Sequence, residues 1–399
     1  MTSDKKRHIK DYPSVSLAVI NWERPHLTKT CLTSLKSLDY PSTQLDFMVI
    51  DNNSSDESVK LIRADFPDIP IHVNTENNYA KALNLAIKKA KGEFIGFLNN
   101  DVIIEQNWLK ESISAIQSRE NAGAVGGKIM FDDKKTIQST GHKQLENFYW
   151  VDRGFNEKDT GQYNKLEEIK SLCGAAIIYR KKCFDETGLF DENFGMYLED
   201  VDFAFRCSQK GWKLLYAPEA VAYHKFRGTI ENNTVVRTKI ERNRLFVIAK
   251  HFPEQFADCI FESRFFLTES PDIIETDLPI IFNTWTESCA SKKCKTASPS
   301  DLAVKARKFL ERQIRLCQNY EQELLHKDQA IVEMKHRAIE KEQALIEIKH
   351  LMVNKESELA EKNIEILLAK KEMEKIRNTR SWKILSALYN LRKKIGLTS

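Results

Sequence analysis

The feature that most constrains this chain is a run of five residues without a polar side chain, Phe94 to Leu98, followed at once by Asn99, Asn100 and Asp101. Such a run is typical of a strand that is buried on both faces in a parallel sheet. In open parallel sheets, ligands bind in the crevice beyond the carboxyl ends of the strands. The three polar residues therefore indicate an oxygen-rich site that suits a hard divalent cation and, through it, a diphosphate. They are equally suited to cap a helix that begins near Gln106, because Asn and Asp are preferred capping residues.

Short apolar runs alternate with helical patterns in the first part of the chain. Predicted strands are 14–21, 46–50, 71–73 and 94–98, and predicted helices are 25–38, 57–66 and 79–91. This alternation predicts a parallel, doubly wound α/β sheet. Asn21, Asp51 and Asp101 stand at the ends of three of these strands, so we expect their side chains to converge on one crevice. No GxGxxG or Walker-type loop is present, so the pocket must hold phosphates with a metal and side chains.

Three carboxylates, Glu199, Asp200 and Asp202, lie at the start of a helix that is predicted to end at Gly211. Charges this close repel one another unless basic groups, a metal or water face them. Taken alone, the cluster is explained more simply as a negatively charged helix N-terminus than as a catalytic site, because the helix dipole favours such a terminus. Taken alone, His224 is likewise more often a structural histidine than a ligand.

The region between these motifs gives weaker signals. Residues 132–168 receive no firm assignment, and their aromatic residues Tyr149, Trp150 and Tyr163 are expected to pack locally, with contact to a sugar ring as the alternative. Further on, short extended segments are predicted at 214–217 and 220–223, and His224 follows the second of them.

Charge and cysteine usage limit the class of protein. With 61 basic and 57 acidic side chains the formal net charge is only +4, so bulk charge gives no case for nucleic-acid binding. The eight cysteines lack CxxC and Cys/His spacing, which argues against a zinc site and a disulfide framework and fits a reducing, cytosolic compartment. Neither a signal-peptide pattern nor an apolar run of about 18 residues occurs, so we expect any membrane association to be peripheral.

The character of the chain changes after residue 265. Prolines and a run rich in Ser, Thr and Lys predict a linker over 266–300. Beyond it, apolar residues recur every seven positions from Leu310 to Met373, while the second heptad column contains several lysines. This pattern predicts a coiled coil of moderate stability over 301–378, in a dimer or trimer, and a single long charged helix is the alternative.

The two ends of the chain are predicted to be tails. Residues 1–13 are polar and basic, and we expect a flexible segment there. Residues 379–399 alternate apolar side chains, among them Trp382, with basic ones. A basic amphipathic helix of this kind suits an anionic membrane surface, here the inner face of the cell membrane. The alternative is a helix that binds a partner, such as a glycan-assembly enzyme, or caps the chain itself.

Six stretches in a fixed order carry a resemblance to a known family. They are VIDNNSSD at 49–56, NYAKALNLAI at 78–87, GEFIGFLNNDV at 92–102, GLFDENFGMYLEDVDFAFR at 188–206, GWKLLYAPEAVAYH at 211–224 and RNRLFVIAKHFP at 242–253. Together they resemble the inverting GT-A glycosyltransferases of family 2, particularly the bacterial rhamnosyltransferase-like branch. The resemblance implies a Rossmann-like GT-A domain over 14–265, with a mostly parallel sheet flanked by helices, in front of the predicted coiled coil.

The resemblance also implies roles for individual residues. Asp200 matches the catalytic base, with Glu199 beside it. Asp101 matches the last position of the metal-binding DXD motif, and His224 matches a second contact to the metal or diphosphate, with Mg²⁺ or Mn²⁺ as the implied cofactor. Contacts to the nucleotide-sugar are implied for Asn21, Asp51, Lys81, Asn99, Asn100 and Arg206.

Two positions depart from the family pattern. The DXD motif is Asn-Asn-Asp here, which leaves Asp101 as the only charged ligand of that loop and puts metal affinity in doubt. Asn78 stands where many members have Gly, which is a modest change because Asn tolerates the left-handed conformation.

The implied function is metal-dependent transfer of a sugar, with inversion, from a UDP- or dTDP-linked donor to a hydroxyl of a surface glycan that we expect to be lipid-linked. One base acting on the acceptor, without a covalent intermediate, inverts the anomeric carbon. The alternative is a catalytically weak or inactive GT-A scaffold that recruits glycan-assembly enzymes through its coiled coil. The missing DXD carboxylate mildly favours this alternative, whereas the retained Asp51, Asp101, Glu199, Asp200 and His224 disfavour it.

Overall fold

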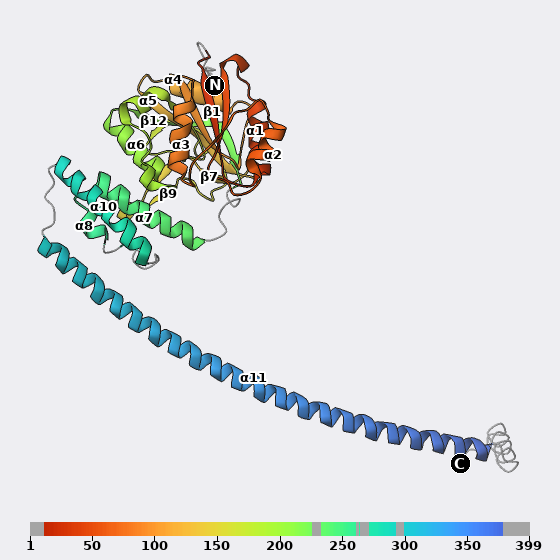
Figure 1. Cartoon of the computed structure of the whole chain (residues 1–399). Helices are drawn as coiled ribbons and strands as arrows, with labels where there is room; N and C mark the ends of the chain where they lie inside the picture. The colour runs from red at the N-terminus through yellow and green to blue at the C-terminus, as the bar shows by residue number, and fades with distance from the viewer. Residues whose placement is uncertain (1–11, 226–232, 261–262, 264–270, 293–298, 378–399) are drawn as a thin grey trace. The chain divides into compact units, whose positions relative to one another are not determined.

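The structure is a computed structural model that describes residues 12–225, 233–260, 263, 271–292 and 299–377 (Figure 1). The chain divides into two compact units, Met1–Phe309 and Leu310–Ser399. The predicted C-terminal tail over 379–399 lies outside the described residues, as does nearly all of the predicted N-terminal tail. Among the described helices, none combines the length and the apolar character that crossing a membrane requires.

The first unit is built on one large sheet. In its described part, the strand order is β10-β12-β6-β11-β4-β1-β2-β3, with β5 on β12 and β7 on β6, and a separate β8–β9 hairpin. The strands are β1 (Val15–Asn21), β2 (Leu45–Asp51), β3 (Ile71–Val73), β4 (Phe94–Asn99), β5 (Val102–Ile104), β6 (Ala122–Phe131), β7 (Ile137–Ser139), β8 (His142–Gln144), β9 (Trp150–Asp152), β10 (Glu167–Ile169), β11 (Ala176–Arg180) and β12 (Lys213–His224). The predicted mostly parallel sheet is confirmed: β4, β1, β2 and β3 run parallel, and β11 is the antiparallel insertion between β4 and β6.

Helices cover both faces of this sheet (Figure 1). The helices of the first unit are α1 (Pro25–Lys36), α2 (Ser58–Asp65), α3 (Tyr79–Lys89), α4 (Trp108–Gln117), α5 (Lys181–Thr187), α6 (Glu199–Gln209), α7 (Asn233–His251), α8 (Phe256–Cys259) and α10 (Pro271–Lys292). Successive residues of a strand point to opposite faces. Accordingly, Val15, Leu17 and Val19 of β1 join a core with α1, α2 and α4, whereas Ala18 and Ile20 join a core with α3, α5 and α6.

The end of the sheet differs from the prediction at one point. The two extended segments expected around residue 218 form a single strand, β12, whose register against β6 shifts between Ala217 and Val221. Pro218 lies in this break. Since proline has no N–H to donate to the ladder, an irregularity here is the expected result, and the strand then continues to His224.

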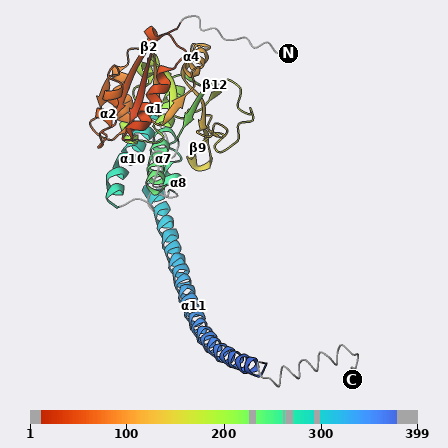
Figure 2. The same ribbon diagram turned by 90° about the vertical axis from the view of Figure 1, so that its right-hand side faces the viewer.

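A third core forms where a linker was predicted. Residues 271–292, inside the predicted linker 266–300, form helix α10, which packs on α7 (Figure 2). Ile281, Trp285 and Cys289 of α10 are buried, and the Trp285 indole donates to the carbonyl of Pro253 at 2.7 Å. The prolines in this segment predict a linker. The apolar residues at positions 281, 285 and 289, however, have the spacing of one helix face, and the packing of this face stabilises the helix.

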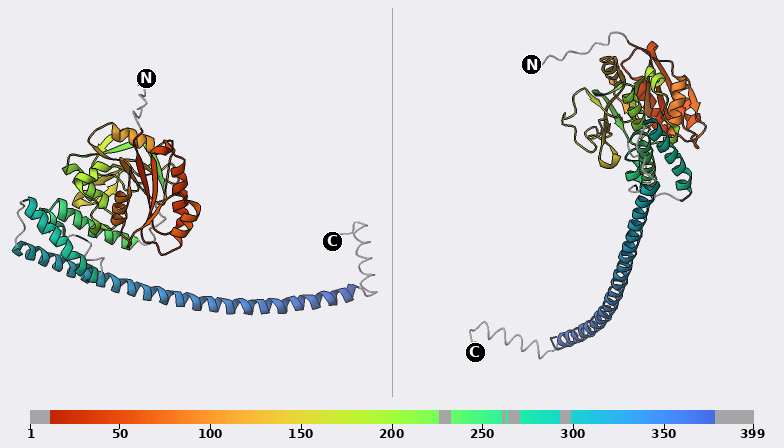
Figure 3. Two further views of the ribbon diagram at one scale, coloured as in Figure 1. Left: turned by 45° about the horizontal axis from the view of Figure 1, so that its top comes forward. Right: turned by 90° about the vertical axis from the view of Figure 1, so that its left-hand side faces the viewer.

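In the second unit, the described residues belong to α11 (Pro299–Arg377), a continuous helix of 79 residues (Figure 3). Six apolar residues of the predicted heptad column are between 48% and 61% exposed: Ile331, Leu345, Met352, Leu359, Ile366 and Met373. In this single copy of the chain, the described residues of the heptad column are exposed to solvent. The coiled coil stays a prediction.

Candidate active site

A cavity beyond the carboxyl end of β4 is lined by side chains that are far apart in the sequence. Asn99 ends β4, Glu199 and Asp200 begin α6, and His224 ends β12. Among the described residues that line this cavity, none is a lysine or an arginine. Four residues predicted for the site therefore share one cavity of anionic character.

Asp101 and His224 contact each other at the edge of the sheet. The pairing of β5 with β12 sets Val102 opposite His224, and the Asp101 Oδ1 atom lies 2.9 Å from His224 Nε2. His224 Nδ1 is 2.8 Å from the Oε1 atom of Gln138. An amide oxygen only accepts, so Nδ1 carries a proton. Nε2 is the ring nitrogen that faces the buried Asp101 carboxylate.

This pair fits a divalent metal ion. Two ligands at right angles on an octahedral ion with bonds of about 2.1 Å lie about 3 Å apart, close to the observed 2.9 Å between Asp101 and His224. Gln138 occupies the position of the outer partner that orients a metal-ligating histidine. One carboxylate and one imidazole leave most of the coordination shell to water or substrate oxygens.

A second set of predicted residues meets where β1 and β2 end. Asn21 and Asp51 are register partners, and the Asn21 amide donates to Asp51 Oδ1 at 2.6 Å. Asn21 also accepts from the Thr28 hydroxyl, and its Oδ1 lies 3.5 Å from the Asn100 amide. These hydrogen bonds join Asn21, Asp51 and Asn100 in a polar network, and Asn100 is the residue directly before Asp101.

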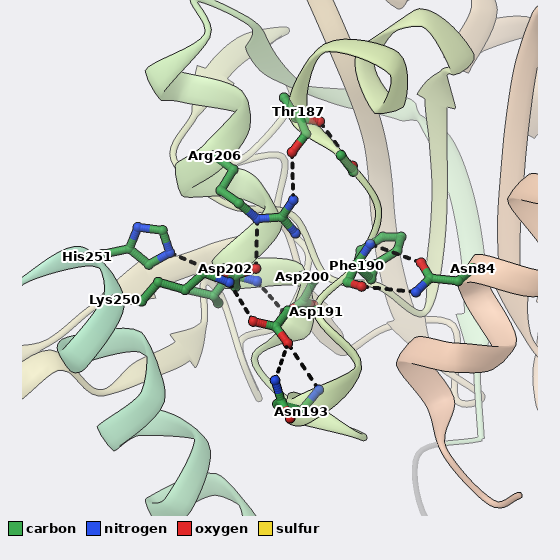
Figure 4. Close-up of polar contacts among 12 residues, drawn as sticks. Asn84, Thr187, Phe190, Asp191, Asn193, Asp200, Asp202, Arg206, Lys250 and His251 are labelled. Atoms are coloured by element: carbon green, nitrogen blue, oxygen red, sulfur yellow. Dashed lines mark hydrogen bonds and ion pairs between the residues drawn. The ribbon is translucent and has the colours of Figure 1, made fainter. Parts of the chain in front are cut away.

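The three carboxylates at the start of α6 are divided between two environments. Asp202 is fully buried, does not line the cavity and belongs to an ion cluster (Figure 4). It accepts from Arg206 at 2.9 Å and His251 at 2.8 Å, and Lys250 lies 3.0 Å from it. Its negative charge is therefore compensated by α6 and α7 side chains, which leaves Glu199 and Asp200 to face the cavity.

Asp200 is held by backbone N–H groups. Its Oδ2 accepts from Gly174 at 3.1 Å and its Oδ1 from Val201 at 2.8 Å. Burial raises the pKa of Asp200 above its ordinary value, and the nearby His142 opposes this shift. Burial and the charge of Asp200 raise the pKa of Glu199 well above its ordinary value. A carboxylate with a raised pKa accepts a proton more readily near neutral pH.

The turn that leads into α6 is strained and is held from α7. Tyr197 and Leu198 have positive φ angles of 78° and 63°, which non-glycine residues rarely adopt. The fully buried Asn243 amide contacts the carbonyl oxygens of Phe194, Met196 and Tyr197 at 2.8, 2.9 and 2.7 Å. Asn243 therefore fixes the backbone immediately before Glu199 and Asp200. The sequence gives no signal that singles out Asn243 for this role.

Besides Asn21, Asp51, Asn100 and Asp101, which lie next to the cavity lining without belonging to it, two further predicted contacts are outside the cavity. Lys81, on α3, pairs with Glu76 at 2.8 Å, and Arg206 is occupied by Asp202 and by the carbonyl of Thr187. Neither residue is among those that line the cavity. Arg206 comes four residues after Asp202, and this helical spacing favours the intrahelical ion pair that the structure contains.

Several cavity residues come from the region that the sequence left unassigned. His142 and Asp152 lie opposite each other on the β8–β9 hairpin, and Trp150 is on the same hairpin; all three line the cavity, as does Cys173 from the segment before β11. Strand pairing brings the three hairpin residues together, so no spacing in the sequence could have found them. Trp150 was considered as a sugar contact and does line the cavity, whereas Tyr149 donates to Glu241 outside it.

Comparison with known proteins places this geometry in context. Residues 16–188 match the family model described as Glycosyl transferase family 2. The O-antigen biosynthesis protein RfbC of Myxococcus xanthus is 27% identical over 231 residues, which are 54% of this chain and 18% of RfbC. The N-acetylglucosaminyl-diphospho-decaprenol L-rhamnosyltransferase of Mycobacterium tuberculosis is 25% identical over 230 residues, which are 51% of this chain and 74% of that protein. The chain thus spans less than a fifth of the first of these relatives.

A solved structure shares the fold. The crystal structure of GalNAc-T7 with UDP, GalNAc and Mn²⁺ matches with a TM-score of 0.51 at 14% identity, covering 72% of this chain and 55% of that chain. At this identity the likeness concerns the fold alone.

Proposed function

We propose that the chain transfers a sugar from a nucleotide-sugar donor to a hydroxyl group of a surface-glycan acceptor, with inversion, because its residues 16–188 match the model of glycosyl transferase family 2. The observation that carries the proposal is the single cavity that gathers Asn99, Glu199, Asp200 and His224 beyond the end of β4. The family match ends before α6, so for Glu199, Asp200 and His224 the proposal rests on their position in this cavity. The O-antigen relative supports a surface glycan, and the decaprenol-linked substrate in the name of the mycobacterial relative supports a lipid-linked one.

For the donor, we propose a UDP- or dTDP-sugar whose nucleotide lies over the ends of β1 and β2. The Asn21–Asp51–Asn100 network supplies buried amide and carboxylate groups there, and GalNAc-T7, which shares the fold, was crystallised with UDP. Asn99 at the end of β4 precedes Asn100 of this network and itself lines the cavity, and its Oδ1 accepts from the Tyr79 hydroxyl at 2.7 Å.

For the cofactor, we propose Mg²⁺ or Mn²⁺ held by Asp101 and His224, whose 2.9 Å separation supports a shared ion. When bound, the ion would neutralise the diphosphate that departs from the sugar. Gln138 orients the His224 ring, the β5–β12 pairing includes His224, and the Asp101 carbonyl accepts from the Lys225 N–H at 3.1 Å.

For the acceptor, we propose that Asp200 takes the proton of the attacking hydroxyl. The backbone N–H groups of Gly174 and Val201 orient its carboxylate, and Trp150 and Tyr197 offer aromatic walls for a sugar ring in the same cavity. General-base catalysis by a positioned side chain contributes about 10²–10⁴-fold in rate.

A pair of variants tests the assignment. Asp200→Asn removes the base while keeping the shape, so transfer should fall by at least about 100-fold while donor affinity changes less than twofold. Asp101→Ala should weaken Mn²⁺-dependent donor binding. Donor binding is measured by calorimetry, and transfer is measured with a panel of nucleotide sugars and Mn²⁺. Unchanged turnover in Asp200→Asn would remove this residue from the mechanism. Wild-type protein that binds but never turns over any donor of the panel would favour the scaffold alternative.

For the second unit, we propose that α11 joins two or three chains through its heptad column. The support is the unbroken apolar column together with its exposure in the isolated chain. The tail over 379–399, which lies outside the described residues, is proposed on its sequence alone to bind an anionic membrane surface or an assembly partner.

A further inference from the structure

A cluster of metal-ligating side chains lies beside Asp200 and has no part in the proposed transfer. The cluster consists of His142, Asp152 and Cys173, whose ligand atoms all lie within 4.8 Å of one another. The first two residues are cross-strand partners on β8 and β9, and Cys173 lies after β10. Three separate segments therefore deliver one nitrogen, one oxygen and one sulfur donor to the same wall of the cavity.

We propose that this cluster binds a soft divalent transition-metal ion, Zn²⁺ above all, at a site separate from the Asp101–His224 pair. The class of ion follows from the donors, because imidazole, carboxylate and thiolate together suit Zn²⁺, whereas Mg²⁺ and Ca²⁺ take oxygen ligands. Ligand atoms around a tetrahedral zinc lie about 3.3–3.8 Å apart. The ligand atoms of the cluster lie up to 4.8 Å apart, so side-chain movements of about 1 Å would bring them to these distances.

Two features of the cluster point to a ligand. His142 Nδ1 lies 2.9 Å from the hydroxyl of the fully buried Ser171, which orients the ring so that Nε2 faces Asp152 Oδ1 at 3.7 Å. This Asp152 oxygen is buried and, among the described residues, has no hydrogen-bond partner. Buried carboxylate oxygens are nearly always satisfied, and a cation between Asp152 and His142 would satisfy this one.

The position of the cluster gives the ion a consequence for transfer. Asp200 Oδ2 lies 4.0 Å from His142 Nε2, within reach of the fourth position of a tetrahedral ion. Zn²⁺ would then bind the Asp200 carboxylate, which the proposed function needs as its general base, and would inhibit transfer. Binding converts the Cys173 thiol to a zinc-bound thiolate and releases its proton to solvent, so no oxidant or reductant is required. The inhibition rests on the proposed function, but the binding does not.

Cobalt substitution tests the binding without any activity assay. The full chain is titrated with Co²⁺, and any Co²⁺ at the Asp101–His224 pair stays silent in this assay because that pair contains no thiolate. The expected result is a thiolate-to-cobalt charge-transfer band in the near ultraviolet that added Zn²⁺ removes. Cys173→Ser should abolish the band, and His142→Ala should weaken Co²⁺ affinity by about 10–100-fold. Cys259→Ala, which changes a buried cysteine of the helical core away from the cavity, should leave the band unchanged.

Two outcomes would overturn the proposal: wild-type protein without the band, or a band of equal strength in Cys173→Ser and in a second variant, Cys173→Ala. Thermal unfolding of each variant shows whether it is folded. If transfer is detectable, the Zn²⁺ concentration that halves the rate should rise at least tenfold in Cys173→Ser. A chain with the cobalt band but no transfer would contradict the proposed function and leave the metal site standing.

Discussion

At the scale of single residues, Asn243 links the stability of the chain to the geometry of its cavity. One buried amide contacts three carbonyl oxygens of the turn over 194–197, and this turn contains a positive φ angle at Tyr197. A strained backbone persists only where its surroundings over-determine it. The start of α6, with Glu199 and Asp200, therefore depends on a side chain from another helix.

Replacement of this amide should weaken both properties. In Asn243→Ala, we expect the free energy of unfolding to fall by about 1–3 kcal/mol, because buried carbonyl oxygens lose their partner. We also expect slower transfer with unchanged donor affinity, because only the acceptor side of the cavity is displaced. Urea denaturation and donor calorimetry measure the two effects. The exposed Asn121→Ala is the matched control, and equal stability of the two variants would contradict the role of Asn243.

The residue scale also shows what the sequence could reveal of the site. The resemblance, whose motifs span the domain, led us to expect that Asp101 and His224 act together. In the structure these two side chains contact each other. Arg206 was expected at the nucleotide-sugar but pairs with Asp202, since a helical spacing of four residues offered it a nearer carboxylate. His142 and Asp152 were not found, because only strand pairing brings them together.

At the scale of elements, Asp202 couples α6 to α7. Burial alone would raise the pKa of Asp202, but the hydrogen bond from His251 and the charges of Arg206 and Lys250 lower it below its ordinary range. Burial lowers the pKa of His251 from its ordinary 6.5, although Asp202 opposes this shift. For both groups the unfolded chain binds protons more readily than the folded chain does. Their contributions to stability are thus lost as the pH falls.

The pH range of this loss differs between the two groups. The contribution of His251 is present above pH 6.5 and is lost as the pH falls below it, whereas that of Asp202 is lost only below its ordinary 3.8. His251→Gln keeps a donor for Asp202 but removes the titrating group. We therefore expect the decline in the free energy of unfolding between neutral pH and about pH 5 to be shallower in His251→Gln than in wild type. Parallel declines would contradict this account.

Helix α10 provides a second test at this scale. Short apolar runs with polar ends predict the strands β1 to β4 almost to the residue, whereas the prolines of 266–300 predict a linker where the structure has α10. If 271–292 packs as the structure has it, Trp285→Ala should cost about 3–5 kcal/mol of unfolding free energy. The exposed Glu287→Ala should cost almost nothing. A linker would tolerate both changes equally, so thermal or urea denaturation of the two variants decides.

At the scale of the whole molecule, self-association of α11 has a direct test. The expectation is a dimer or trimer of the full chain that dissociates when lysines replace Leu345 and Leu359, both more than half exposed in the single chain. Glu340→Lys with Glu361→Lys is the matched control, since these residues lie outside both heptad columns. Light scattering well above micromolar concentration measures the mass. A monomeric wild type would rule out association through this helix.

The absence of lysine and arginine from the described lining of the cavity bears on which sugars can enter it. An acceptor that carries a uronic acid would bring a further negative charge next to Asp152 and Asp200, whereas a neutral hexose or an amino sugar would not. Repulsion of this kind discriminates between substrates without a dedicated contact. The chain would then discriminate against acidic acceptors by charge repulsion. The ratio of the transfer rates to matched neutral and uronic acceptors would measure this discrimination.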